Sequence, residues 1–104
     1  MDLAKIQEVV FKEYLKNGFA QSFQKTKPIF MGDLAELGLV TTEVSEAIEA
    51  VRDGTKEKIA MECADVVIRI MNFCSRKDID LQKAILEKND YNFQREIHHG
   101  RKNI

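Results

Sequence analysis

Two pairs of acidic residues lie at equal distances on either side of Gly54. The inner pair, Glu46 and Glu62, is eight residues from this glycine, and the outer pair, Glu43 and Asp65, is eleven residues from it. Helical periodicity surrounds both pairs, and the glycine belongs to the only compact turn signal between them. Two amphipathic helices with so short a link are expected to pack antiparallel. The four carboxylates would then meet at matching heights.

Helical spacing of apolar residues continues through most of the chain. It predicts helices over residues 2–16, 33–52, 55–76 and 81–96, with Asp2, Thr55 and Asp80 as N-cap residues of the first, third and fourth. Residues 18–31 have no clean period and are expected to form a loop that can include a short helical turn. We therefore expect an all-α fold of four helices in a bundle-like arrangement.

The second predicted helix carries a continuous apolar stripe. Gly38 interrupts this helix and costs about 1 kcal/mol relative to alanine, so we expect another backbone to approach it closely. The stripe follows steps of three and four residues and consists of Leu37, Val40, Val44, Ala47, Ile48 and Val51.

The predicted loop is rich in aromatic residues, with Phe19, Phe23 and Phe30. Two interpretations remain open for these rings. They either plug one end of the helical bundle or form a wall of a pocket that binds a nucleobase.

Length and composition limit the class of protein. A chain of 104 residues is expected to be one domain, residues 1–104, and so small a domain buries only about 60–70% of its unfolded surface, which favours an oligomer. With 16 basic and 17 acidic side chains, the chain has no bulk attraction for nucleic acid or an anionic membrane. No signal peptide or membrane-spanning run is apparent. Two cysteines that cannot pair within one helix, Cys63 and Cys74, indicate a cytoplasmic setting.

One of the four carboxylates is in an unusual position. Glu62 falls inside the apolar stripe of the third predicted helix, where an isolated charge is too costly to bury. Arg69, seven residues further on, could satisfy part of this charge through a salt bridge. Four converging carboxylates against one arginine still leave an excess of negative charge. An all-oxygen, anionic site of this kind suits a hard cation, Mg²⁺ or Mn²⁺.

The last predicted helix offers cations that complement the acidic pairs. Lys88, Asn92 and Arg95 follow steps of four and three residues, so they share one face with Leu81 and Ile85. Basic groups beside metal-binding carboxylates are what phosphoryl chemistry requires. The alternative is a surface stripe whose basic side chains reach into solvent.

These motifs together resemble the all-α nucleoside triphosphate pyrophosphohydrolases of the MazG-like superfamily. LVTTEVSEAIEAVR followed by MECADVVIRI resembles the family's ExxE…ExxD pattern, KNDYNFQR is similar to its K-x-x-x-N-x-x-R segment, and the tail HHGRK is similar to the ending of some short members. The resemblance covers roughly residues 30–102.

The resemblance implies a MazG-type fold and hydrolysis of a (deoxy)nucleoside triphosphate to the monophosphate and pyrophosphate with Mg²⁺ or Mn²⁺. It implies homodimers or homotetramers with sites at subunit junctions. By position, the catalytic metal ligands would be Glu43, Glu46, Glu62 and Asp65, and the substrate-binding residues would be Lys88, Asn92 and Arg95.

The chain departs from the family pattern at two positions. Many members begin each motif with two glutamates, whereas this chain has Thr42 and Met61 at the leading positions. The departures put in question the number of metal ions and the identity of a separate general base.

Two other function classes remain. One is a non-catalytic helical module that binds nucleotides or another protein, as a degenerate relative would. The other is a di-metal carboxylate oxidoreductase, which requires Glu-x-x-His pairs; here the residues three positions after Glu43 and Glu62 are Glu46 and Asp65.

Overall fold

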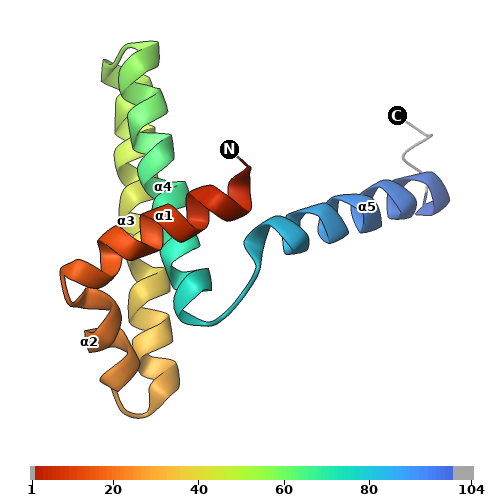
Figure 1. Ribbon diagram of the computed structural model, residues 1–104. Coiled ribbons are helices and arrows are strands. Elements are labelled where there is room, and N and C mark those ends of the chain that lie inside the picture. Colours follow the sequence, from red (N-terminus) through yellow and green to blue (C-terminus); the bar gives the residue numbers. More distant parts are fainter. Residues whose placement is uncertain (1, 100–104) are drawn as a thin grey trace.

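The computed structural model describes the backbone of residues 2–99 and the side chains of residues 2–95; the predicted basic tail from residue 98 onward lies outside the described side chains. The described chain is all-helical, as predicted (Figure 1). It contains five helices, one more than expected: α1 (Leu3–Lys16), α2 (Phe19–Lys25), α3 (Ile29–Asp53), α4 (Lys56–Arg76) and α5 (Leu81–His99).

The three predicted N-caps are confirmed. The carboxylate of Asp2 accepts a hydrogen bond from the amide of Lys5, and the hydroxyl of Thr55 accepts one from the amide of Lys58. Asp80 accepts from the amide of Lys83 at the start of α5 in the same way. Each cap satisfies an amide that has no partner within its own helix, which explains why these helices begin where they do.

The additional helix, α2, occupies the first half of the predicted loop. The side chain of Asn17 accepts a hydrogen bond from the amide of Phe19, at the start of this seven-residue helix. The next helix, α3, begins at Ile29, four residues earlier than predicted, directly after Pro28.

The close backbone approach that we expected at Gly38 occurs instead at Gly32. A Cβ atom on Gly32 would overlap the carbonyl oxygen of Phe23 in α2, whereas no described atom lies within 4 Å of a Cβ at Gly38. The prediction for Gly38 was therefore wrong within this chain. The absence of a side chain at Gly32 lets the short helix α2 lie directly on α3.

α3 and α4 form a long antiparallel hairpin that turns at Gly54, as the mirrored acidic pairs predicted (Figure 1). α1 lies across α4, and α2 packs on α3 at the end of the hairpin far from the turn. α5 does not complete a four-helix bundle: it packs against α1 and leaves the hairpin (Figure 1). No helix in residues 2–99 is long and apolar enough to cross a membrane.

A buried polar network joins α1, α3 and α4 near that far end. Arg76 donates to Glu36 and to Asp33, and Tyr14 donates its hydroxyl hydrogen to Glu36 over 2.8 Å. Burial, reinforced by the hydrogen bond to Glu36, raises the pKa of Tyr14 and keeps it protonated. Because Glu36 is fixed from both sides, the network holds the ring of Tyr14 at a set position beside the hairpin.

The apolar stripe of α3 is only partly covered within the chain. Ala47 and Ala50 lie on the side of α3 that faces the other helices, whereas Ile48 and Val51 remain 59% and 65% exposed. Leu34, Leu37 and Val44 continue this exposed stripe along the helix. Of the six positions predicted to face the core, Leu37, Val44, Ile48 and Val51 are therefore exposed within the chain, and only Val40 and Ala47 are partly covered.

Candidate active site

The hairpin brings three of the acidic residues together. Glu43 on α3 and Glu62 and Asp65 on α4 each offer a carboxylate oxygen, and these three oxygens lie within 4.8 Å of one another. The outer pair of the sequence pattern thus meets across the hairpin, because equal distances from Gly54 become equal heights in an antiparallel arrangement. Asp65 is exposed to solvent, whereas Glu43 and Glu62 are partly buried.

Glu46 belongs to the same group of charges. The carboxylate of Glu43 raises the pKa of Glu46 most, followed by partial desolvation and by the charges of Glu62 and Asp65. The shift reflects the charges of the neighbouring carboxylates, since like charges disfavour ionisation at short range, but Glu46 is not among the three residues whose oxygens lie within 4.8 Å of one another. We refer to Glu43, Glu46, Glu62 and Asp65 as the acidic cluster.

Glu62 is the enclosed member of the acidic cluster. Its Oε2 atom is buried and has no hydrogen-bond partner among the described residues. A carboxylate oxygen in this condition carries an uncompensated desolvation cost unless a cation or donor reaches it. This agrees with the position of Glu62 inside the apolar stripe of its helix.

Arg69 compensates only part of the negative charge. Its Nε atom lies 3.4 Å from Oε1 of Glu43, and both side chains are partly buried. This is the one ion pair that the described residues form with the acidic cluster. One guanidinium against four carboxylates leaves room for a divalent cation, and the all-oxygen donor set suits Mg²⁺ or Mn²⁺. The residues present therefore fit the metal that the sequence predicts.

A polar stripe along α4 organises these contacts. It follows steps of three and four residues and consists of Glu62, Asp65, Arg69, Asn72 and Arg76. Towards the far end of the hairpin its members pair with acids on α3: Arg76 with Glu36, and Arg69 with Glu43. Towards the turn, carboxylate faces carboxylate. The same helical register thus produces neutralised pairs at one end and unneutralised negative charge at the other.

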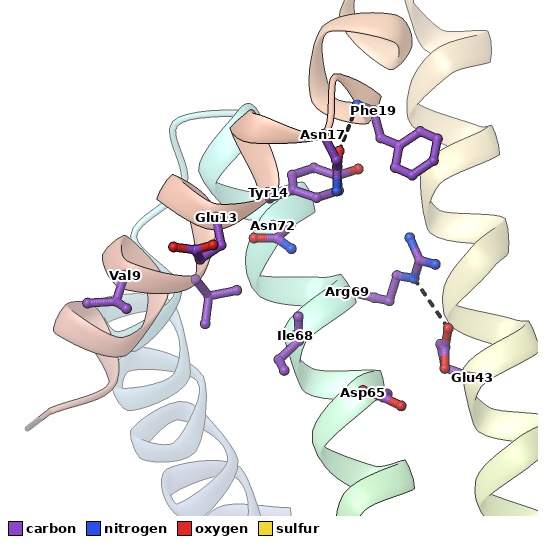
Figure 2. A pocket seen from close by; sticks show the side chains of 11 residues that line it. Val9, Glu13, Tyr14, Asn17, Phe19, Glu43, Asp65, Ile68, Arg69 and Asn72 are labelled. Carbon is purple, nitrogen blue, oxygen red and sulfur yellow. Dashed lines mark hydrogen bonds and ion pairs between the residues drawn. The ribbon is translucent and has the colours of Figure 1, made fainter.

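A cavity of about 550 Å³ adjoins the acidic cluster. Figure 2 shows Glu43 and Asp65 at one end of it, Tyr14, Asn17 and Phe19 at the other, and Arg69 between them. Its walls come from α1, the start of α2, and the facing sides of α3 and α4. The cavity therefore has a charged end at the hairpin and, beneath α1, an end of mixed amide, aromatic and apolar lining that also includes the carboxylate of Glu13.

The structure places the rings of the aromatic segment in different surroundings, and binding of a nucleobase beside any of them stays a prediction. Phe19 lines the cavity, as the pocket interpretation requires. Phe23 lies against the guanidinium of Arg76, 5.9 Å from the ring centre to Cζ, and so helps to close the far end of the helices. Phe30 is more than half exposed and does not line this cavity.

The basic residues of α5 share one face of that helix but do not join the acidic cluster within one chain. Lys88 and Arg95 both lie over the ring of Tyr91, at 4.6 and 5.9 Å from its centre. Asn92 is partly buried, and its Oδ1 atom has no described hydrogen-bond partner. α5 packs on α1 and runs away from the hairpin (Figure 1). The predicted role of these three residues in binding substrate is not tested by one chain alone.

Sequence reasoning did not assign Asn72 or Tyr14 to the site. Asn72 lies seven residues after Asp65, two helical turns further along the same face, so its spacing was a usable signal. Tyr14 lies at helical spacing on the first helix, together with Ile6 and Val10, a pattern that indicates a core position and no role in a site. Its contact with Glu36 crosses 22 residues of sequence and has no local signal.

Comparison with known proteins agrees with this geometry. The family model of the MazG nucleotide pyrophosphohydrolase domain matches residues 32–97, well over half of the chain. The match spans the α3/α4 hairpin with all four members of the acidic cluster and most of α5. Comparison with curated proteins and with solved structures finds no match. On the family match and the helical architecture together, this chain belongs to the MazG nucleotide pyrophosphohydrolase domain family.

Proposed function

We propose that this protein hydrolyses a (deoxy)nucleoside triphosphate to the monophosphate and pyrophosphate in a Mg²⁺-dependent reaction. The observation that carries the proposal is the acidic cluster, in which carboxylates from two helices converge and one oxygen of Glu62 has no described partner. Membership of a family of nucleotide pyrophosphohydrolases supplies the reaction class.

The acidic cluster would hold the metal ion, with Mn²⁺ as an alternative to Mg²⁺. A divalent cation held by these carboxylates would supply positive charge that offsets the negative charge of the phosphate chain during hydrolysis. Arg69 beside Glu43 holds that carboxylate in place and limits its mutual repulsion with the others. The open face of Asp65 leaves the phosphate chain a route of approach from solvent.

We propose that the active unit is a homodimer or homotetramer. The exposed stripe of α3, which ends at Ile48 and Val51 near the turn, and the exposed Leu86 and Phe93 on α5 support this, because monomers rarely leave large apolar patches uncovered. A second copy would cover the stripe. It would also give the basic face of α5 an acidic cluster to meet, with Lys88, Asn92 and Arg95 contacting phosphate or sugar across the junction.

Three further expectations remain part of this proposal. Residues 1–104 act as one domain; the partner is a small nucleotide rather than nucleic acid or membrane; and the protein works in the cytoplasm. The balanced charge of the chain and its two free cysteines, Cys63 and Cys74, support the last two. The competing function is a non-catalytic nucleotide-binding module. Thr42 and Met61 favour it, because they stand where many members of the family have a glutamate.

The test is turnover of each nucleoside triphosphate with Mg²⁺ by the natural protein and by Glu62→Gln. The substitution keeps the shape of the side chain and removes the charge that would hold the metal, so we expect turnover to be abolished in a folded protein. Glu57→Gln is the matched control, since Glu57 is an exposed glutamate in the first turn of the same helix, and it should turn over normally. A natural rate in Glu62→Gln contradicts the metal site; no turnover by the natural protein favours the module.

A further inference from the structure

The cavity beside the acidic cluster changes character along its length. At the hairpin end its lining is carboxylate, from Glu43 and Asp65. At the α1 end it is mainly amide, aromatic and apolar, from Asn17, Asn72, Phe19, Val9 and Val10, with the exposed carboxylate of Glu13 at its edge. A nucleoside triphosphate has the same polarity: an anionic chain that follows a metal, and a flat base with hydrogen-bonding edges. The proposed substrate can therefore be placed in the cavity in one direction, with its phosphates at the hairpin end and its base at the α1 end.

Asn72 is the buried polar group on which this orientation depends. The residue is only 5% exposed, lines the cavity, and has an Oδ1 atom without a hydrogen-bond partner among the described residues. Buried side-chain amides are normally satisfied, because an unpaired one costs free energy. A ligand that brings an N–H group to Asn72 would remove that cost.

The distance along α4 suits this assignment. Asn72 lies seven residues from Asp65, which is about 10 Å of helix rise. A substrate whose phosphates lie at Asp65 would extend its nucleoside towards Asn72 rather than away from the protein. Arg69 stands between the two positions, where it faces the phosphate end of the nucleoside.

The wall opposite Asn72 is held rigidly. Tyr14 is buried, and its hydroxyl hydrogen is donated to Glu36, which Arg76 fixes in turn. Asn17 is fixed as well, since its side-chain oxygen accepts from the amide of Phe19 over 2.9 Å. Because these hydrogen bonds already hold Tyr14 and Asn17, binding in the cavity would require little reordering of this wall.

Building on the proposed function, we propose that this cavity holds the nucleoside half of the substrate and that Asn72 is the residue that recognises the base. Its amide accepts from an N–H group on the base edge and donates to the neighbouring acceptor, as asparagine does in bidentate contacts with bases. The acidic cluster selects for the triphosphate, and Asn72 selects among bases.

The experiment measures binding rather than turnover. Isothermal titration calorimetry with Mg²⁺ would compare two probes: the α,β-methylene analogues of the four common nucleoside triphosphates, which resist cleavage at the proposed bond, and inorganic tripolyphosphate. The variant is Asn72→Leu, which keeps the branched shape and the number of heavy atoms of the side chain and removes its amide. Cys74→Ala is the control, because Cys74 is buried on the same helix and does not line the cavity.

We expect Asn72→Leu to bind the preferred analogue about ten-fold or more weakly, as loss of a hydrogen bond to a buried group requires. The preference among the four bases should shrink, while the affinity for tripolyphosphate stays within about two-fold of the natural protein. The melting temperature should be unchanged or higher, since an unpaired buried amide has been removed. Cys74→Ala should keep the natural base preference.

Three results would overturn the assignment: natural analogue binding in Asn72→Leu, an equal loss for both probes, or equal affinity of the natural protein for all four bases. Its failure is separable from failure of the proposed function. If the natural protein releases pyrophosphate while Asn72→Leu keeps its base preference, only the base assignment falls. If analogue binding depends on Asn72 but no nucleotide is hydrolysed, only the enzymatic proposal falls.

Discussion

Arg76 and Glu36 form an enclosed ion pair in which Nε of the arginine lies 2.6 Å from Oε1 of the glutamate. The two side chains are 3% and 1% exposed. The other oxygen of Glu36 accepts from Tyr14, and the remaining guanidinium nitrogens donate to Asp33 and Gln24. These interactions therefore connect four helices at the end of the hairpin opposite the turn, and one wall of the candidate site depends on them.

Arg76→Met should be strongly destabilising. It removes the cation and leaves the charge of Glu36 buried without compensation, so we expect the free energy of unfolding in urea to fall by about 3–5 kcal/mol. Lys16→Met is the control, because Lys16 pairs with Glu13 at a site where both side chains are more than 70% exposed, and it should change stability by less than about 0.5 kcal/mol. Equal effects of the two substitutions would contradict a structural role for the buried pair.

Asp33 should make stability depend on acid pH. Hydrogen bonds from Lys77 and then from Arg76 hold the pKa of Asp33 below its usual value. A depressed folded pKa stabilises the protein above the unfolded pKa, near 3.9, and this stabilisation is lost as the pH falls through the folded pKa. The stability difference between the natural protein and Asp33→Asn should thus be constant near neutral pH and shrink below about pH 4. Chemical denaturation at several pH values measures it, and a pH-independent difference would refute the linkage.

Replacing each of the two glycines of α3 with alanine should change the stability of the protein in opposite directions. At Gly32 a Cβ would overlap the carbonyl oxygen of Phe23, so Gly32→Ala must push α2 off α3 and should cost about 1–3 kcal/mol. At Gly38 the space within the chain is open, and Gly38→Ala should gain up to about 1 kcal/mol from helix propensity. Thermal unfolding of both variants at equal protein concentration makes the comparison. Destabilisation by Gly38→Ala would place a neighbouring chain at that position.

These residues show which parts of the molecule could be predicted from sequence. The caps at Asp2 and Thr55 and the mirror relation about Gly54 were predictable because each depends on residues close in sequence. α2 was missed because a seven-residue helix has little stability of its own and packs on α3 through Gly32. The pair of Glu36 and Arg76 was missed because its partners are 40 residues apart.

Part of the candidate site could likewise be predicted from the sequence, and part could not. The approach of Glu43 to Asp65 follows from helical period and turn position alone. The cavity does not, because its walls come from α1 and α2, and only the packed chain brings them to the hairpin. The position of α5 relative to the hairpin was not predictable either. Its apolar residues could be buried equally well against its own chain or against a partner chain.

Ile48→Asp should dissociate the proposed oligomer. Ile48 is 59% exposed in the stripe on α3, and a carboxylate there would be buried without a partner in any assembly that covers the stripe. Sedimentation velocity should give the mass of a dimer or tetramer for the natural protein and of a monomer for the variant, with helical content unchanged. Glu49→Asp, at the next position on the exposed side, should keep the natural mass. A monomeric natural protein would contradict the proposed assembly.

The identity of the products tests the central claim most directly. The natural protein, incubated with each nucleoside triphosphate and Mg²⁺, can be followed by ³¹P NMR, which distinguishes pyrophosphate from orthophosphate and monophosphates from diphosphates. The acidic cluster and the family membership predict pyrophosphate and a nucleoside monophosphate in equal amounts for at least one nucleotide. Orthophosphate with a nucleoside diphosphate, or intact triphosphate in every sample, would contradict the account.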